Sequence, residues 1–400
     1  MVPALRKAYN DSFTVQKYEA FLKDLDSRYP GAIEFRIAET PVFVPASFSD
    51  QITDACEKII DFILHPSFKQ ITERSISPGD RVPNENDHSH FLVFDFGICR
   101  NGDGNLEPQL IEMQGFPSLY GFQAWYPDLL RNHFPIPGDY SQYLNGYDHT
   151  SYIEELKRVI LGDTPPENTI LLEIKPHEQK TKIDFYCTRD YLGIQPVCLT
   201  ELILEGENLF YINEKTGKKT RVRRIYNRII FDELNALDQD RLGPHIDIRQ
   251  PLDVEWIPHP NWFYRISKFT MPFIRHPFVP PTFFLNEIKQ LPSDLENYVL
   301  KPLFSFAGQG VIIDLTMEDL DKIKDPRNWI LQRKVNYADC IQTPDIPAKA
   351  EIRMMYLWKD GDDRPSLAIN LARLSKGKMI GVRYNKDKEW VGGSVSFFER

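Results

Sequence analysis

The segment HFLVFDFGICRNGDGNLEPQLIEMQ, residues 90–114, has the pattern of a β-hairpin that carries polar side chains on one face. Its first run is rich in aromatic and branched residues, and NGDGN at 101–105 is a hairpin turn signal. Asp95 lies between two phenylalanines on the first strand. Glu112 and Gln114 share one face of the returning strand, because side chains alternate along a strand.

These three side chains suit a divalent cation. Mg²⁺ takes hard oxygen ligands and usually combines one or two carboxylates with phosphate oxygens. The hairpin therefore predicts a metal site at Asp95, Glu112 and Gln114. The alternative is that the two acids form ion pairs with buried arginines. Both interpretations require the hairpin to meet a distant part of the chain.

A second informative segment is YVLKPLFSFAGQGVIIDL, residues 298–315. An apolar strand delivers Lys301, a loop of small residues follows, and a second strand is expected after the loop. Small residues let backbone N–H groups approach phosphate oxygens, and a nearby lysine adds a positive charge. The alternative is a surface hairpin with a solvated lysine. The loop residues concerned are Ser305, Ala307, Gly308 and Gly310.

Other polar residues stand in apolar surroundings in the C-terminal part. Lys268 precedes an apolar run in ISKFTMPFI, where a surface lysine is the alternative. Gln332, at the end of the strand WILQRKV, could face an adenine edge, or the segment could be an ordinary edge strand. Arg353 and Arg373 lie in two strands, 350–358 and 367–381. Because buried arginines are rarely unpaired, each needs a carboxylate or a phosphate.

The rest of the chain alternates helical and strand patterns. Helices are expected at 13–30, 50–64 and 151–161, the second capped by Ser49 or Asp50. A strand at 168–175, a helix at 178–191 and a strand at 192–200 predict a small α/β unit with a parallel pair. A hairpin follows at 209–227, and the proline-containing stretch 243–262 is expected to be a linker.

Composition narrows the class of protein. Of 400 residues, 48 are Lys or Arg and 57 are Asp or Glu, and the net charge of −9 argues against a general nucleic-acid binder. The five cysteines follow no disulfide or zinc spacing. No apolar run reaches the length of a membrane span, and the first residues lack a secretory pattern. We therefore expect a cytoplasmic protein without a membrane partner, with a homodimer as one option.

The joint order of these motifs resembles the circularly permuted branch of the ATP-grasp superfamily, which includes glutathionylspermidine synthase; only its synthetase domain is concerned. In an ordinary chain of this superfamily, the phosphate lysines come first and the metal ligands last. Here the last part stands at 94–122 and the first part at 266–394. The resemblance implies an α/β, circularly permuted ATP-grasp fold with an inserted pre-ATP-grasp domain. The implied domains are 1–160, 161–260 and 261–400.

The resemblance also implies roles for single residues. Arg353 and Arg373 would hold phosphate or acyl-phosphate oxygens, and Asn385 would lie near the transferred group. The implied metal ligands are Asp95, Glu112 and Gln114, although Gln114 replaces the usual Asn and Val93 replaces an Arg. Arg36, Arg81 and Arg228 are candidate substrate residues, with a surface role as the alternative. The implied ATP-binding residues are Lys268, Lys301, Ser305, Ala307, Gly308, Gly310, Gln332 and Val335.

The implied activity is an ATP- and Mg²⁺-dependent ligation of a small-molecule carboxylate to a small-molecule amine. ATP would convert the carboxylate to an acyl phosphate, which the amine attacks to form an amide or peptide-like bond. The positive side chains would offset the charge of the triphosphate and the carboxylate. Two alternatives stay open: a kinase or other phosphotransferase, and a nucleotide-binding protein without catalysis.

Overall fold

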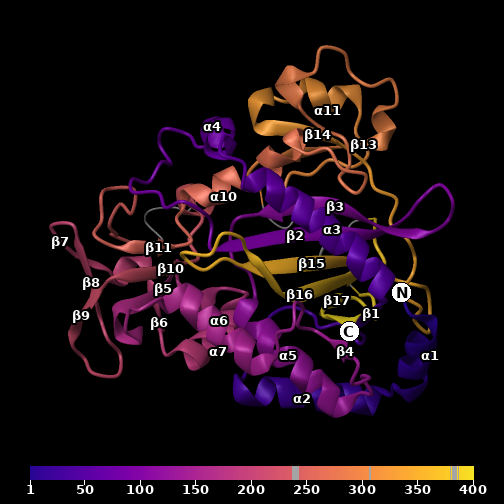
Figure 1. The fold of residues 1–400 in the computed structure, drawn as a ribbon, viewed down its shortest axis with the longest axis horizontal. Helices are drawn as coiled ribbons and strands as arrows, with labels where there is room; N and C mark the ends of the chain where they lie inside the picture. Colours follow the sequence, from indigo (N-terminus) through magenta and orange to yellow (C-terminus); the bar gives the residue numbers. More distant parts are fainter. Residues whose placement is uncertain (237–242, 306–307, 379, 381–384, 386) are drawn as a thin grey trace.

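A five-stranded antiparallel sheet forms the centre of the molecule, in the order β17-β16-β15-β2-β3 (Figure 1). The computed structural model describes residues 1–236, 243–305, 308–378, 380, 385 and 387–400. The sheet joins strands from both ends of the chain, so the N-terminal hairpin lies beside the C-terminal strands. Its strands are β2 (Phe91–Arg100), β3 (Leu106–Gln114), β15 (Lys349–Leu357), β16 (Ser366–Ser375) and β17 (Gly392–Ser394).

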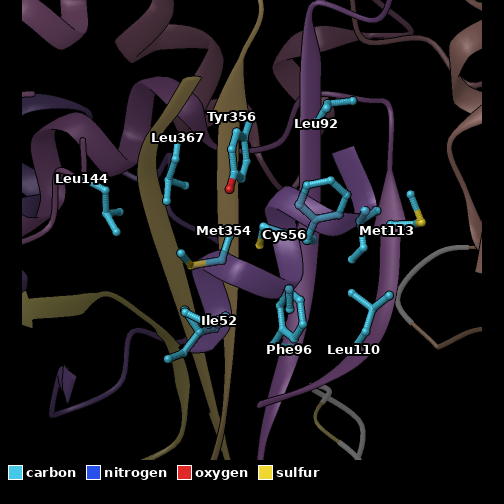
Figure 2. Close-up of a cluster of buried hydrophobic side chains, with 14 of the residues drawn as sticks. Ile52, Cys56, Leu92, Phe96, Leu110, Met113, Leu144, Met354, Tyr356 and Leu367 are labelled. Atoms are coloured by element: carbon cyan, nitrogen blue, oxygen red, sulfur yellow. The ribbon is translucent and has the colours of Figure 1, made fainter. Parts of the chain in front are cut away.

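One face of this sheet packs against helix α3 (Ala46–Ile63). Figure 2 shows Ile52 and Cys56 of the helix beneath side chains of β2, β3, β15 and β16. Leu92 and Phe96 point into this core, and the alternation along β2 therefore sends Asp95 to the opposite face. The helix begins after Pro45, so the expected cap at Ser49 or Asp50 is wrong by about one turn.

Helices cover part of the other face. Helices α5 (Tyr120–His133) and α6 (His149–Leu161) pack on Phe91, Val93 and Met355. The N-terminal helix α2 (Val15–Arg28) lies below them in Figure 1 and packs against α5, and α1 (Pro3–Ser12) lies to the right. The sequence predicted α2 and α6 but not α1 or α5. The remaining small elements here are α4 (Phe68–Thr72) and a three-stranded sheet of β1 (Val42–Val44), β18 (Ser396–Glu399) and β4 (Tyr140–Ser141).

The predicted parallel pair is present as part of a four-stranded parallel sheet, in the order β11-β10-β5-β6. The expected linker 243–262 contains its edge strand β11, and the expected hairpin 209–227 ends in its inner strand β10. Helices α7 (Lys182–Leu192) and α8 (Phe231–Ala236) belong to the same stretch of chain. The strands are β5 (Thr169–Glu173), β6 (Gln195–Cys198), β10 (Arg224–Asn227) and β11 (Glu255–Ile257); a separate sheet holds β7 (Ile203–Glu205), β8 (Asn208–Ile212) and β9 (Lys219–Val222).

A small lobe stands above the central sheet in Figure 1. It contains a three-stranded antiparallel sheet, β12-β14-β13, in which β14 is central, so the edge-strand interpretation of WILQRKV is wrong. The expected second strand after Lys301 is reduced to one isolated bridge between Leu300 and Ile312. The elements of the lobe are the 3-10 helix η5 (Lys268–Phe273), β12 (Thr282–Phe284), β13 (Tyr298–Pro302), α11 (Met317–Asp321) and β14 (Trp329–Arg333). Helix α10 (Asn261–Arg265) precedes them and lies near α4. Among the described helices, none is long and apolar enough to cross a membrane.

Candidate active site

A cavity of about 350 Å³ lies where the central sheet meets the small lobe. Strands β2 and β3, the small lobe and strands β15 and β16 all contribute side chains to it. Residues that are distant in the sequence therefore meet in one place. The predicted residues that line the cavity are Asp95, Glu112, Lys268, Lys301, Ser305, Gly308, Gln332, Val335 and Arg373.

Asp95 is the fully buried centre of an ion-pair cluster. Arg353 donates to both of its oxygens at 2.6 Å, and the Nη2 of Arg373 donates to Oδ2 at 2.5 Å. Burial alone would raise the pKa of Asp95, but the two guanidinium groups outweigh it and hold this pKa at about 2. Burial opposes the charge of Arg373 as well, and the carboxylates of Asp95 and Glu351 raise its pKa despite this. In the structure, the partner of both arginines is therefore a carboxylate.

Glu112 lies directly opposite Asp95, and Gln114 lies opposite Val93. The Glu112 carboxylate is partly exposed, in contrast to Asp95. It lies 3.8 Å from the Lys268 ammonium and accepts a hydrogen bond from Gln114 Nε2 at 2.9 Å. Glu112 is therefore the acid of the hairpin that offers oxygen atoms to the cavity.

A β-bulge orients the hairpin at this point. Asp95 pairs with Glu112 and Phe96 with Leu110, so Ile111 is an extra residue in β3. The bulge keeps Leu110 and Met113 in the core while Glu112 faces the cavity. The carbonyl of Ile111 accepts a hydrogen bond from Lys301 Nζ at 2.9 Å. Burial lowers the pKa of Lys301 to about 8, because desolvation disfavours the charged ammonium more than the nearby acids stabilise it.

The small lobe supplies the remaining walls. Gln332 is buried and its Nε2 donates to the carbonyl of Leu110 at 3.4 Å. Val335 follows β14 and lines the cavity together with several aliphatic residues. This combination places aliphatic side chains near a buried amide, and such a pocket suits an apolar ring with polar edges. The aliphatic lining residues are Ile111, Val299, Val311, Ile313, Val335 and Ile380.

The lining carries an excess of positive charge. Among the described residues it contains three acids, Asp95, Glu112 and Glu351, against a larger set of basic side chains. Ser305 Oγ and Arg373 Nε are buried there without a hydrogen-bond partner in the described chain. Unpartnered buried polar atoms are costly, and a polyanion could satisfy them. The basic lining residues are Lys268, Lys301, Arg333, Lys334, Lys349, Arg373 and Lys378.

The donor set fits Mg²⁺ only in part. Glu112 has accessible carboxylate oxygens, and a Mg²⁺ bound with a nucleotide needs few protein ligands. Asp95 is saturated by guanidinium groups, and the hairpin acids do not form a cluster of three metal-ligating groups in the described part of the chain. The cluster found there is His90, Glu255 and Asp360, where Arg224 already pairs with both carboxylates.

Two of the polar cavity residues that the sequence analysis did not predict form a hydrogen-bonded pair at Arg373. Glu351 is buried on β15, with a carboxylate 3.3 Å from Arg373, and burial raises its pKa. Tyr337 donates a hydrogen bond to the same carboxylate. Strand alternation could have found Glu351, which stands two residues before Arg353, but no pattern marks Tyr337, which lies outside the regular elements.

Several predicted residues have protein partners elsewhere and do not line the cavity. Asn385 Oδ1 accepts from the backbone N–H of Lys376 at 2.9 Å. Arg36 pairs with Glu39, and Arg81 pairs with Glu73. Gly310 and Gln114 also lie outside the lining, and Ala307 lies outside the described residues.

The buried Arg228 contacts the segment that follows the β2–β3 hairpin. It donates to the carbonyl of Pro117, and its guanidinium lies 5.2 Å from the ring of Phe116. Nearby, Asp184 of α7 accepts hydrogen bonds from the backbone N–H groups of Gly121 and Phe122 at 2.8 and 2.9 Å. These contacts fix residues 116–122 against the parallel-sheet unit, and they give Arg228 a backbone partner within the protein.

Comparison with known proteins gives a likeness to solved structures. The chain matches no family model and no curated protein. Its structure is similar to that of a glutathione synthetase-like effector from Globodera pallida, solved in the apo form, with a TM-score of 0.57 and 12% identity over 96% of both chains. At this identity the likeness concerns the fold alone. The molecule therefore has a mixed α/β fold that is similar to the fold of this glutathione synthetase-like protein.

Proposed function

We propose that this protein is an ATP-dependent carboxylate–amine ligase that forms an amide or peptide-like bond through an acyl phosphate. The observation that carries the proposal is the cavity itself, where the buried Lys268 and Lys301 face Glu112 beside an aliphatic wall. An aliphatic wall suits a base, and buried ammonium groups suit phosphates. The glutathione synthetase-like fold supports the same reaction class, and the permuted order and the inserted unit at 161–260 belong to this proposal.

The proposed roles follow from charge. Lys268 and Lys301 bind phosphate oxygens of ATP, while Gln332 and Val335 orient the base. Arg373, whose Nε is free to donate, binds the substrate carboxylate or its acyl phosphate. Asp95 and Glu351 keep that guanidinium charged and oriented. The amine then attacks the acyl carbon and phosphate leaves, so no side-chain nucleophile is needed.

Glu112 is the residue proposed to hold Mg²⁺ together with the nucleotide. The ion would supply charge neutralisation between phosphate groups. Because Asp95 is engaged with two arginines, the proposal assigns Asp95 to positioning these arginines rather than to the metal. Glu112→Gln is expected to weaken binding of Mg·ATP more than binding of ATP without Mg²⁺, as measured by calorimetry.

The reaction class is tested by ADP and phosphate release over pairs of small carboxylates and amines. A ligase releases both only when a carboxylate and an amine are present together. A kinase releases ADP with transfer of the phosphoryl group and produces no free phosphate. ADP release with any one acceptor and no free phosphate would contradict the ligase proposal and support a phosphotransferase.

A second candidate function is nucleotide binding without catalysis. It is favoured by the saturation of Asp95 and by Gln114, whose amide binds Glu112. Binding of Mg·ATP without hydrolysis across the same panel of acids and amines would support this candidate over a ligase. Replacing Gln114 by Asn then asks whether the shorter amide restores turnover.

A further inference from the structure

Residues 303–305 connect strand β13 to the loop at the cavity, and each of these residues makes contacts that hold the segment in place. The backbone N–H of Leu303 donates to the carbonyl of Asn328 at 2.9 Å, and its side chain packs with Phe269, Phe284 and Ile330. The contacts of Phe304 and Ser305 lead to the segment that carries Lys268.

The ring of Phe304 packs on an aromatic pair in helix α10. It meets Tyr264 edge-on, with ring centroids 5.0 Å apart and planes at 79°, and it lies 6.4 Å from Phe263. Both partners belong to the hydrophobic cluster of the parallel-sheet unit, and Phe304 packs against that cluster. The ring therefore ties the loop to the stretch of chain that leads directly into η5 and Lys268.

The next residue, Ser305, contacts Lys268 directly. The carbonyl of Ser305 accepts a hydrogen bond from Lys268 Nζ at 2.9 Å. Lys268 is buried, and its nearest acid, Glu112, is 3.8 Å away. A buried ammonium needs hydrogen-bond acceptors at fixed positions, because desolvation is otherwise uncompensated. The position of the Ser305 carbonyl thus sets where the ammonium points.

We propose that Phe304 is a positioning residue, which anchors the Ser305 carbonyl and through it orients the Lys268 ammonium toward the cavity. The role in binding rests on the proposed function, since Lys268 is there a phosphate-binding residue. The orientation of Lys268 does not depend on any ligand. A test of the nucleotide-free protein can therefore be separated from a test of ATP binding.

The first experiment measures the reaction of lysine amines with acetic anhydride in the nucleotide-free protein, by peptide mass spectrometry. Phe304→Ala is expected to speed acetylation of Lys268 several-fold relative to Lys301, which is held by Ile111. Phe304→Tyr keeps the ring and should behave as the wild type. Phe283→Ala, which removes a 40% exposed ring in the same lobe, is the matched control. An unchanged rate at Lys268, or an equal rise at both lysines, would overturn the proposal.

The second experiment is a double-mutant cycle on Mg·ATP affinity. Phe304→Ala is expected to weaken binding roughly tenfold, as for loss of one charge-assisted hydrogen bond. In the Lys268→Met background the same change should have no further effect. Additive losses would show that Phe304 acts independently of Lys268 and would contradict the inference. A wild-type protein that binds no nucleotide would contradict the proposed function, while the acetylation rates would still decide the role of Phe304.

Discussion

Asp95 is the residue on which the ion-pair cluster depends. Its carboxylate is fully buried and pairs with Arg353 and Arg373, so Asp95→Asn leaves two guanidinium groups without their common partner. Breaking a buried pair costs about 3–5 kcal/mol of unfolding free energy. Urea unfolding should show a loss of that size. Asp11→Asn, which breaks an exposed pair with Lys7, is the control and should change stability little. Equal stability of wild type and Asp95→Asn would contradict this account.

The ion pairs of Asp95 should also make the unfolding free energy depend on pH in the acid range. The pKa of Asp95 lies at about 2 in the folded protein, below its ordinary value of 3.8. A lowered pKa contributes stability above the ordinary value and loses it as the pH falls toward 2. The wild type should therefore lose more unfolding free energy than Asp95→Asn between pH 4 and pH 2. Parallel pH profiles would contradict the pairing.

The lowered pKa of Lys301 predicts how the affinity for a nucleotide depends on pH. Burial lowers its pKa to about 8, whereas an ordinary lysine has 10.5. Phosphate binds the protonated form, so the affinity for ATP should begin to fall above about pH 8, approaching tenfold per pH unit. Lys301→Met should remove this dependence. An affinity that stays constant up to pH 10 in the wild type would contradict the assignment.

The sequence indicated that the acids of the hairpin and the two buried arginines meet, but it did not indicate which acid pairs with which arginine. Alternation placed Asp95 and Glu112 on one face, and the need of buried arginines for an anion left a carboxylate or a phosphate as the partner. That Asp95 takes both arginines depends on the register of β2 with β15, which no local pattern specifies. The backbone partners of Arg228 and Asn385, which are Pro117 and Lys376, could not be predicted from any local pattern.

Strand β2 also approaches the segment after β14 closely at Gly97. A Cβ at this position would lie 2.7 Å from Tyr337 Cε1 and 3.3 Å from Ile111 Cδ1, both in residues that line the cavity. Gly97→Ala should therefore displace the Tyr337 ring and cost about 1–3 kcal/mol, as overpacking does. Thermal unfolding and Mg·ATP affinity should both decrease.

The control for Gly97→Ala is Gly79→Ala, where a Cβ would meet nothing within 4 Å. It should leave melting temperature and affinity close to those of the wild type. If Gly97→Ala were equally silent, strand β2 would not be packed tightly against Tyr337, and the wall of the cavity would differ from the one described.

Element types with strong periodicity were predictable, and elements set by tertiary contacts were not. Helix α3 and the hairpin β2–β3 carry their pattern locally. Strand β11 is three residues long, lies among prolines and exists because β10 pairs with it, so it resembled a linker. The stretch after Lys301 has strand-like composition but finds only the bridge at Ile312.

The whole molecule joins its two main sheets through buried polar contacts as well as apolar clusters. Arg224 of β10 donates to the carbonyls of Val159 and Ile160 at 3.1 Å, and it pairs with Glu255 and Asp360. Asp360 follows β15, so this arginine links the parallel sheet to the central one. The pair of Arg224 with Asp360 joins residues 136 positions apart, which no local sequence pattern could reveal. The order of motifs indicated that the chain ends meet, and the structure brings β2 beside β15.

The central claim is that the cavity between the central sheet and the small lobe binds a nucleoside triphosphate. Isothermal titration calorimetry of Mg·ATP tests it most directly, with wild type, Lys301→Met and the control Lys322→Met on exposed α11. We expect one site in the wild type and in Lys322→Met, and at least about tenfold weaker binding in Lys301→Met, since a buried charge–phosphate contact is lost. No binding by the wild type, or equal binding by all three proteins, would contradict it.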